Sequence, residues 1–272
     1  MIYSSNHQLG IFSWFGFVLP LPERLKLIKE AGFNATTLWW EDEIGSPNIK
    51  KDNMPNIVRD SGLVLENIHI PYDNCDNLWS ENKSSRDAIV NKYTTWLNDC
   101  AKYNIPIMVM HITDSLNLPS PNQYGMDSIS RLLKVAQDLD VIIAIENTGR
   151  EDYISFVLSE IKSNYFGFCY DSSHNRIYSN NDLTLLKTFS NCMVATHLSD
   201  NDGNKDHHWL PGEGIIDWEK LTNALPKLQY NGYITLEVYP TEQQLTNTPK
   251  LFLSKAYQRA LWIRDLCSHP PK

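Results

Sequence analysis

The strongest constraint on the fold is a repeated alternation between short apolar runs and longer stretches of helical character. Each apolar run is rich in β-branched residues and closes on a polar residue, and a helical stretch or a long loop follows it. Eight such runs occur, over residues 9–13, 34–40, 63–68, 105–110, 141–145, 165–170, 192–196 and 233–236. Strands that alternate with helices indicate a parallel sheet, and eight of them favour a closed (β/α)8 barrel over an open sheet.

The intervening stretches carry helix signals. Pro22 suits the first turn of the first helix, and Ala31-Gly32 suits its end. Further helices are expected over residues 84–103, 128–139, 182–189, 217–228 and 249–266. Asn231-Gly232 is a helix-end signal after the stretch 217–228.

The chain of 272 residues suits one such barrel, which typically needs about 250 residues. No linker divides the sequence, and no glycine-rich phosphate loop follows the first expected strand, which weakens a Rossmann interpretation. We therefore expect a single TIM barrel domain over residues 1–272.

Composition narrows the class of protein further. The formal net charge of −8 disfavours a broad nucleic-acid surface, although a bound metal could still allow an anionic substrate. Five cysteines without a CxxC pair favour reduced thiols and a cytoplasmic location. No stretch reaches the ~18 apolar residues of a membrane span. No segment indicates how the chain would self-associate, so the sequence leaves open whether it forms a homo-oligomer.

The residues that close the later strands share one kind of chemistry. They are His69, His111, Glu146, Asp171, His197 and Glu237. The strand ends of a parallel barrel converge on one face, so these side chains are expected to lie close together. Imidazole and carboxylate are the types of group that bind transition metals in proteins. An isolated histidine is commonly structural and a buried carboxylate can instead form an ion pair, but six such residues together indicate a metal site.

Loops after these strands add further candidates. His174 follows Asp171 within one loop, and Asp206 and His208 follow His197. The loop that follows His197 could alternatively be an acidic turn exposed to solvent. Trp14 and Arg150 are candidates for the substrate pocket, because an aromatic ring packs on the apolar face of a sugar and an arginine can bind an anion. The run from Glu41 to Glu43 is expected to be a solvated loop.

Several segments together resemble the sugar phosphate isomerase/epimerase family of the xylose isomerase-like barrel superfamily, over nearly the full length. They are Lys29-Glu-Ala-Gly-Phe33, His69-Ile-Pro-Tyr72, Ile143-Ala-Ile-Glu146-Asn147, Tyr170-Asp171-Ser-Ser-His174, His197-Leu-Ser-Asp200, residues 208–218 and Leu236-Glu237. The combination is specific, although each segment alone is weak.

The resemblance implies a metal-dependent isomerase or epimerase with a small carbohydrate substrate. It implies one divalent ion held by Glu146, Asp171, His197 and Glu237, with His174 near substrate hydroxyls. Mn²⁺, Co²⁺, Fe²⁺ or Zn²⁺ would suit this mixture of ligands. We expect Glu146 and Glu237 to be the catalytic pair, which moves a proton next to a carbonyl through an enediolate.

Other functions remain open at this point. The same superfamily contains endonuclease-IV-type apurinic endonucleases with three zinc ions, and His69, His111, His174, Asp206 and His208 occupy the additional ligand positions of that pattern. The acidic sequence after His69 lacks the basic residues and wedges of a DNA-binding loop. A keto-cyclitol dehydratase would have the same metal site and a different substrate. A barrel that only binds a ligand, without catalysis, would be expected to have an incomplete metal site. The substrate, the metal and any phosphate on the substrate stay undetermined.

Overall fold

Eight parallel strands form the centre of the molecule, in the order β7-β6-β5-β4-β3-β2-β1-β8, in a computed structural model that describes residues 7–45, 47–224 and 230–268. The strands are β1 (Leu9–Phe12), β2 (Ala35–Trp39), β3 (Val64–His69), β4 (Ile107–Met110), β5 (Ile142–Glu146), β6 (Phe166–Asp171), β7 (Met193–His197) and β8 (Ile234–Leu236). The backbone of Leu198 closes the ring, because its N–H donates to the Thr235 carbonyl (2.9 Å) and its carbonyl accepts from the Glu237 N–H (3.1 Å). The predicted (β/α)8 TIM barrel is confirmed.

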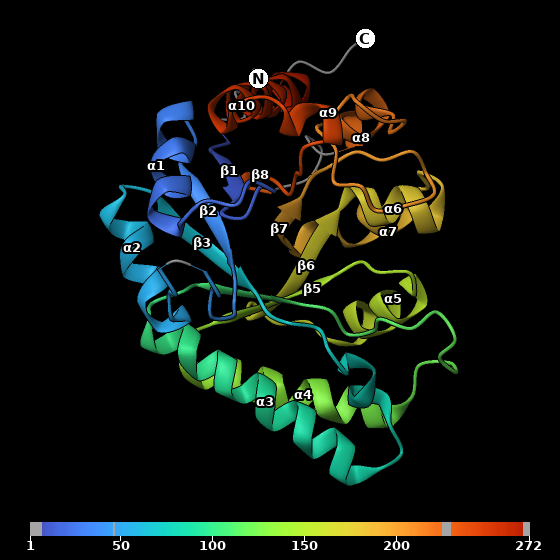
Figure 1. Cartoon of the computed structure of the whole chain (residues 1–272). Coiled ribbons are helices and arrows are strands. Elements are labelled where there is room, and N and C mark those ends of the chain that lie inside the picture. Colours follow the sequence, from blue (N-terminus) through green and yellow to red (C-terminus); the bar gives the residue numbers. More distant parts are fainter. Residues whose placement is uncertain (1–6, 46, 225–229, 269–272) are drawn as a thin grey trace.

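Helices surround the strands on the outside, as Figure 1 shows. They are α1 (Leu21–Ala31), α2 (Met54–Asp60), α3 (Lys83–Lys102), α4 (Gln123–Leu139), α5 (Glu151–Glu160), α6 (Ser172–Ser179), α7 (Thr184–Phe189), α8 (Trp218–Ala224), α9 (Glu242–Leu245) and α10 (Pro249–Ser268). Short 3₁₀ turns add η1 (Lys51–Asn53), η2 (Cys75–Trp79) and η3 (Ser190–Cys192). None of the helices in the described ranges is both long and apolar enough to cross a membrane.

The strand ends differ slightly from the prediction. His69, Glu146, Asp171 and His197 are the last residues of β3, β5, β6 and β7, whereas the predicted strands stop one residue earlier. A polar side chain can complete a strand here because the barrel mouth lies beside it. The predicted helix over 217–228 is observed as α8, and residues 225–229 lie outside the described residues.

Small apolar side chains form a layer beneath the strand ends. Val109, Ala144, Cys169 and Ala195 pack together and are fully or almost fully buried. Each lies two residues before a polar strand-end residue, so alternation along the strand directs both toward the barrel interior. The layer supports the polar groups above it and excludes water below them.

Trp79 fixes the segment that follows β4. Its indole Nε1 donates to the Ile112 carbonyl (2.7 Å), directly after His111, and the ring is buried against Gly125 in α4. A Cβ on Gly125 would overlap the Trp79 ring. This contact therefore requires glycine, although Gly125 lies inside a helix.

We expect Gly125→Ala to destabilise the protein by about 1–3 kcal/mol, because overpacking outweighs the roughly 1 kcal/mol that alanine contributes to a helix. Urea unfolding measures the difference. Gly45→Ala is the matched control, since the nearest atom to a Cβ there is 3.8 Å away. A Gly125→Ala protein as stable as the control would contradict the expected overlap.

Candidate metal and substrate site

Four residues of neighbouring strands converge at the barrel mouth. Glu146, Asp171, His197 and Glu237 each place one ligand atom within 4.8 Å of those of the others. His197 Nδ1 lies 3.0 Å from Glu146 Oε2 and 3.3 Å from Glu237 Oε2. Asp171 and His197 are opposite each other in the β6–β7 register, which explains why two residues far apart in sequence meet.

The cluster concentrates negative charge in a buried place. Burial raises the pKa of Asp171 to about 7, and the carboxylates of Glu146, Asp206 and Glu237 act in the same direction. Burial also opposes ionisation of Glu146, but His197, His111 and His174 hold the pKa of that carboxyl well below its ordinary value. Asp171 Oδ2 is buried without a hydrogen-bond partner.

These observations fit a bound divalent cation. Three carboxylates and one imidazole form a ligand set that suits transition metals, and a cation would balance the buried negative charge. It would also give the unpartnered oxygen of Asp171 a partner. The residues that could hold it are the four of this cluster: Glu146, Asp171, His197 and Glu237.

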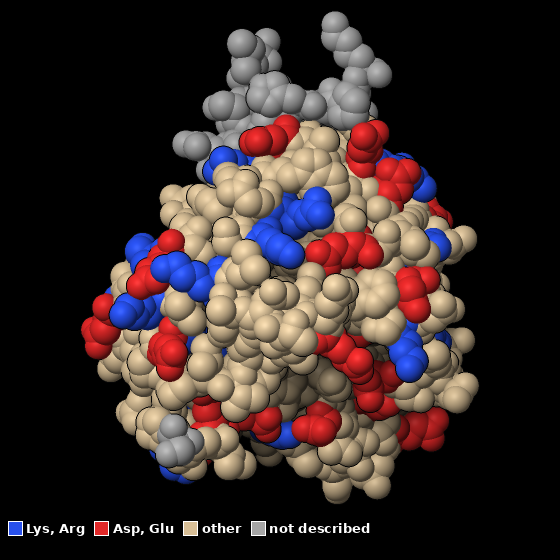
Figure 2. Space-filling view, turned by 45° about the horizontal axis from the view of Figure 1, so that its top comes forward, with Lys and Arg blue, Asp and Glu red and all other residues tan. Residues whose placement is uncertain are grey.

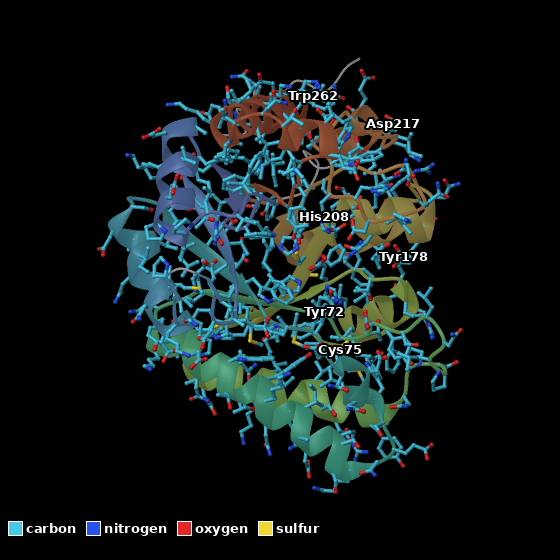
Figure 3. The ribbon with its side chains drawn as sticks, in the orientation of Figure 1. Tyr72, Cys75, Tyr178, His208, Asp217 and Trp262 are labelled. Carbon is cyan, nitrogen blue, oxygen red and sulfur yellow. The ribbon has the colours of Figure 1, made fainter. Side chains whose placement is uncertain are left out.

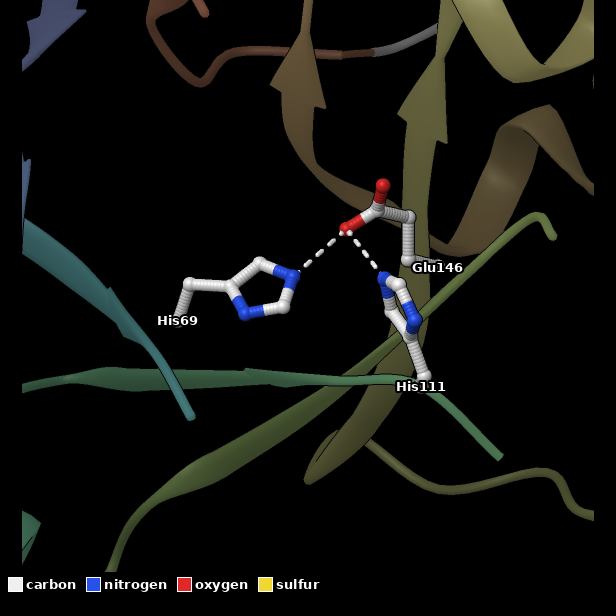
Figure 4. Close-up of side chains that lie close together, drawn as sticks. All are labelled: His69, His111 and Glu146. Carbon is white, nitrogen blue, oxygen red and sulfur yellow. Dashed lines mark hydrogen bonds and ion pairs between the residues drawn. The ribbon is translucent and has the colours of Figure 1, made fainter. Parts of the chain in front are cut away.

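A second group of potential metal ligands also contains Glu146. His69 Nε2 lies 3.0 Å and His111 Nε2 lies 3.7 Å from Glu146 Oε2, so both imidazoles reach one carboxylate oxygen (Figure 4). His69 and His111 are almost fully buried, and burial lowers the pKa of His111. His111 Nδ1 has no hydrogen-bond partner. Two imidazoles around one carboxylate are also a metal-ligand arrangement.

A third group centres on Asp206. Asp206 Oδ2 lies 3.3 Å from His174 Nε2 and 3.0 Å from His208 Nε2. Burial alone would lower the pKa of both histidines. The carboxylates of Asp171 and Asp206 raise the pKa of His174 well above its ordinary value, and those of Glu237 and Asp206 raise the pKa of His208 to about 9. The loop after His197 is therefore more than a solvated turn: residues 204–206 are exposed, but the side chains of Asp206 and His208 reach the cavity wall.

A cavity of about 770 Å³ opens over these groups. Aromatic rings line it: Trp39 stacks on His69 at 5.1 Å between ring centroids, and Tyr72 stacks on His111 at 4.5 Å. Tyr72 and His208, which both line the cavity, are labelled near the centre of the view in Figure 3. A hollow is visible in the face shown in Figure 2, with mainly uncharged and acidic residues around it. Trp14, which the sequence suggested as a substrate-pocket residue, also lines the cavity.

Arg24 joins two loops of the cavity wall. Its guanidinium donates to the carbonyls of Ser13 (2.8 Å) and Leu19 (2.7 Å) and to the carboxylate of Glu43. It also lies 5.2 Å from the centre of the Trp14 ring. This buried arginine fixes the β1–α1 loop against the β2–α2 loop.

Two sequence expectations need revision. Arg150 lies away from the described cavity wall, because its guanidinium binds Asp152 and the carbonyls of the segment 116–119. The run Glu41–Glu43 is part of the cavity wall and not simply a solvated loop. Sequence reasoning missed Arg24, Glu43 and Tyr239 as wall residues. Tyr239 alone carried a signal, since it follows Glu237 by two residues.

The chain matches the family model described as xylose isomerase-like TIM barrel over residues 25–256. An uncharacterized protein of Sinorhizobium fredii is 26% identical over 87% of this chain and 85% of its own length. Fructoselysine 3-epimerase of Escherichia coli O157:H7 is 33% identical over 63 residues, which are 23% of this chain and 22% of that protein. The solved structure of a D-tagatose 3-epimerase-like protein has a TM-score of 0.73 at 18% identity, over 95% of this chain and 98% of the other. Because the family model spans most of the sequence, the chain belongs to the xylose isomerase-like TIM barrel family.

Proposed function

We propose that the protein is a divalent-metal-dependent epimerase or isomerase that acts on a small carbohydrate. The observation that carries this proposal is the buried group of Glu146, Asp171, His197 and Glu237 at the base of the cavity. The names of two similar proteins, a fructoselysine 3-epimerase and a D-tagatose 3-epimerase-like protein, support the choice of reaction and substrate class.

The two glutamates are the proposed acid–base pair. A carboxylate removes the proton from the carbon next to the substrate carbonyl, which leaves an enediolate, and the second glutamate returns a proton to that carbon. Both Glu146 and Glu237 line the cavity, and each lies close to His197 Nδ1. A cation bound by the four residues would polarise the carbonyl and stabilise the developing negative charge. Asp171 and His197 would mainly hold that cation.

Neighbouring residues would orient the sugar. His174 is held by the Asn147 carbonyl at Nδ1, and its Nε2 faces Asp206 at 3.3 Å and is the atom that would donate to the sugar. It lines the cavity, so it can reach a substrate hydroxyl. Trp14 offers an apolar ring to the less polar face of the sugar.

The metal content of the protein, purified without chelator, tests the proposal. We expect about one Mn²⁺ or Co²⁺ ion per chain, because one ligand group has three carboxylates and the highest ligand number. Elemental analysis measures identity and stoichiometry, and screening of ketoses and their epimers follows. A protein that holds no metal, and regains none when these ions are added, would contradict the proposal.

A second function has one observation in its favour. His69, His111 and Glu146 form their own potential metal group, and His174, Asp206 and His208 lie together next to it. A site with three Zn²⁺ ions would suit a zinc phosphodiesterase on abasic DNA. Close to three Zn²⁺ per chain, with nicking of an abasic duplex, would place that function first. A keto-cyclitol dehydratase would use the same metal group on a different substrate.

A further inference from the structure

We infer that the outer half of the cavity binds an uncharged, apolar substituent carried by the sugar, so that the substrate is a substituted and unphosphorylated sugar. This inference rests on the proposed function and specifies its substrate class. It depends on the size of the cavity, on its exposed apolar side chains and on the charges of its wall.

The cavity has two parts of different chemistry. The buried histidines and the carboxylate of Glu146 lie at the strand ends and form the inner part. The loops after β1 and β2 form the outer part, to which Val18, Leu19, Ile44 and Pro47 supply apolar surface beside the acidic residues 41–43. The whole volume of about 770 Å³ falls in the range of roughly 300–1,000 Å³ that is typical for drug-sized ligands. A single sugar ring at the metal group would leave the outer part without a ligand.

Apolar side chains at the mouth are unusually exposed. Val18 is 91% exposed and Ile44 is 94% exposed, and Trp14 and Tyr72 are also open to solvent. All four line this one cavity. They come from three separate loops, after β1, β2 and β3. Exposed apolar groups that gather around a cavity indicate a binding surface for an apolar ligand.

The charges of the wall disfavour a phosphate. Arg24 is the only lysine or arginine among the described residues that line the cavity. Its nitrogens are already bonded to two carbonyls and to Glu43. Glu41 and Asp42 also belong to the wall. A phosphate there would meet carboxylates and no free cation, and it would be repelled.

Calorimetric titration of the Mn²⁺-loaded protein tests this inference without turnover. The ligands are D-fructose, D-fructose 6-phosphate, and the 1-O-benzyl and 6-O-benzyl ethers of D-fructose. We expect one ether to bind at least about tenfold more tightly than fructose, because the ring buries apolar surface. We expect the phosphate ester to bind at least about tenfold more weakly than fructose.

The double variant Val18→Ser/Ile44→Ser identifies the place of binding. Both side chains are more than nine-tenths exposed, so their loss should leave the fold unchanged. We expect the variant to bind the benzyl ether no more tightly than fructose, and to bind fructose as tightly as the wild type does. Leu251→Ser, at an exposed apolar position on α10 outside the cavity wall, is the matched control and should behave as the wild type.

The outcomes separate this inference from the proposed function. Equal affinities for fructose and both ethers, or a gain that persists in the double variant, would overturn the substituent site alone. If the metal-loaded protein binds none of these sugars, both the inference and the proposed function lose their support. The molar mass by light scattering is measured in parallel, and a lower mass of the double variant would assign the apolar patch to contact between copies of the chain and overturn the inference.

Discussion

Replacing Glu237 by glutamine is expected to lower turnover by about 10³-fold, in the middle of the range for removal of a general acid–base group. Glutamine keeps the size of the side chain but cannot carry the proton. The backbone bonds of this position remain, because the Glu237 N–H donates to the Leu198 carbonyl and the Glu237 carbonyl contacts His208 Nδ1. The variant should therefore fold normally, with an unchanged circular dichroism spectrum.

Loss of metal is the competing explanation for an inactive variant, since Glu237 is also a proposed ligand. The assay therefore uses increasing Mn²⁺ up to saturation, with bound metal measured in the same samples. We expect kcat to stay low after the metal is restored. Glu160→Gln, an identical change at the exposed end of α5, is the control and should retain wild-type kcat. Wild-type turnover by the Glu237→Gln protein at saturating metal would rule out the two-carboxylate scheme.

The sequence predicted the barrel, and it allowed the residues of the candidate site to be grouped, because both depend on local pattern. Strand-end polarity is visible along the chain, and parallel strands bring their ends to one face, so Glu146, Asp171 and His197 could be grouped without coordinates. The structure brings these three side chains together with Glu237. The pattern could not show that Glu146 belongs to two groups of potential ligands at once. It contacts His69 and His111 as well as the cluster with His197, and these contacts depend on distances across the barrel.

The cavity wall was predicted less well because it depends on contacts between loops. Arg24 lies on a helix and has an ordinary place in the amphipathic pattern, yet its side chain crosses to Glu43 and to two loop carbonyls. Arg150 shows the converse case. It follows a strand-end motif in sequence, but Asp152 two residues later draws its guanidinium away from the cavity. Side-chain direction, which short-range spacing does not determine, decides both cases.

Glu66 is a buried acid that the sequence did not single out. It lies inside β3 and is 6% exposed, and its Oε1 accepts hydrogen bonds from the hydroxyls of Thr37 (3.1 Å) and Thr235. No lysine, arginine or histidine among the described residues forms an ion pair with it. Burial raises the pKa of Glu66 to about 7, and the two threonine hydroxyls only partly oppose the shift.

This raised pKa makes the ionised carboxylate unfavourable in the folded protein. In the unfolded chain the group ionises near its ordinary value of 4.5, so folding stability falls as the pH rises from that value toward 7 and is constant above it. Glu66→Gln removes the charge at every pH. We expect the variant to be more stable than the wild type by about 3 kcal/mol at pH 8 and by less than about 1 kcal/mol at pH 5.

Urea unfolding at both pH values, with the same saturating metal, measures this difference. Other groups titrate in the same range, but they are common to both proteins, so they cancel in the comparison of wild type and variant. Glu160→Gln, at an exposed position, should change stability by a similar small amount at both pH values. If Glu66→Gln were destabilising to the same extent at pH 5 and pH 8, the carboxylate would be stabilised by its threonine partners beyond the cost of burial. The barrel interior would then tolerate the buried charge of Glu66, whereas a gain in stability that grows with pH would show that it does not.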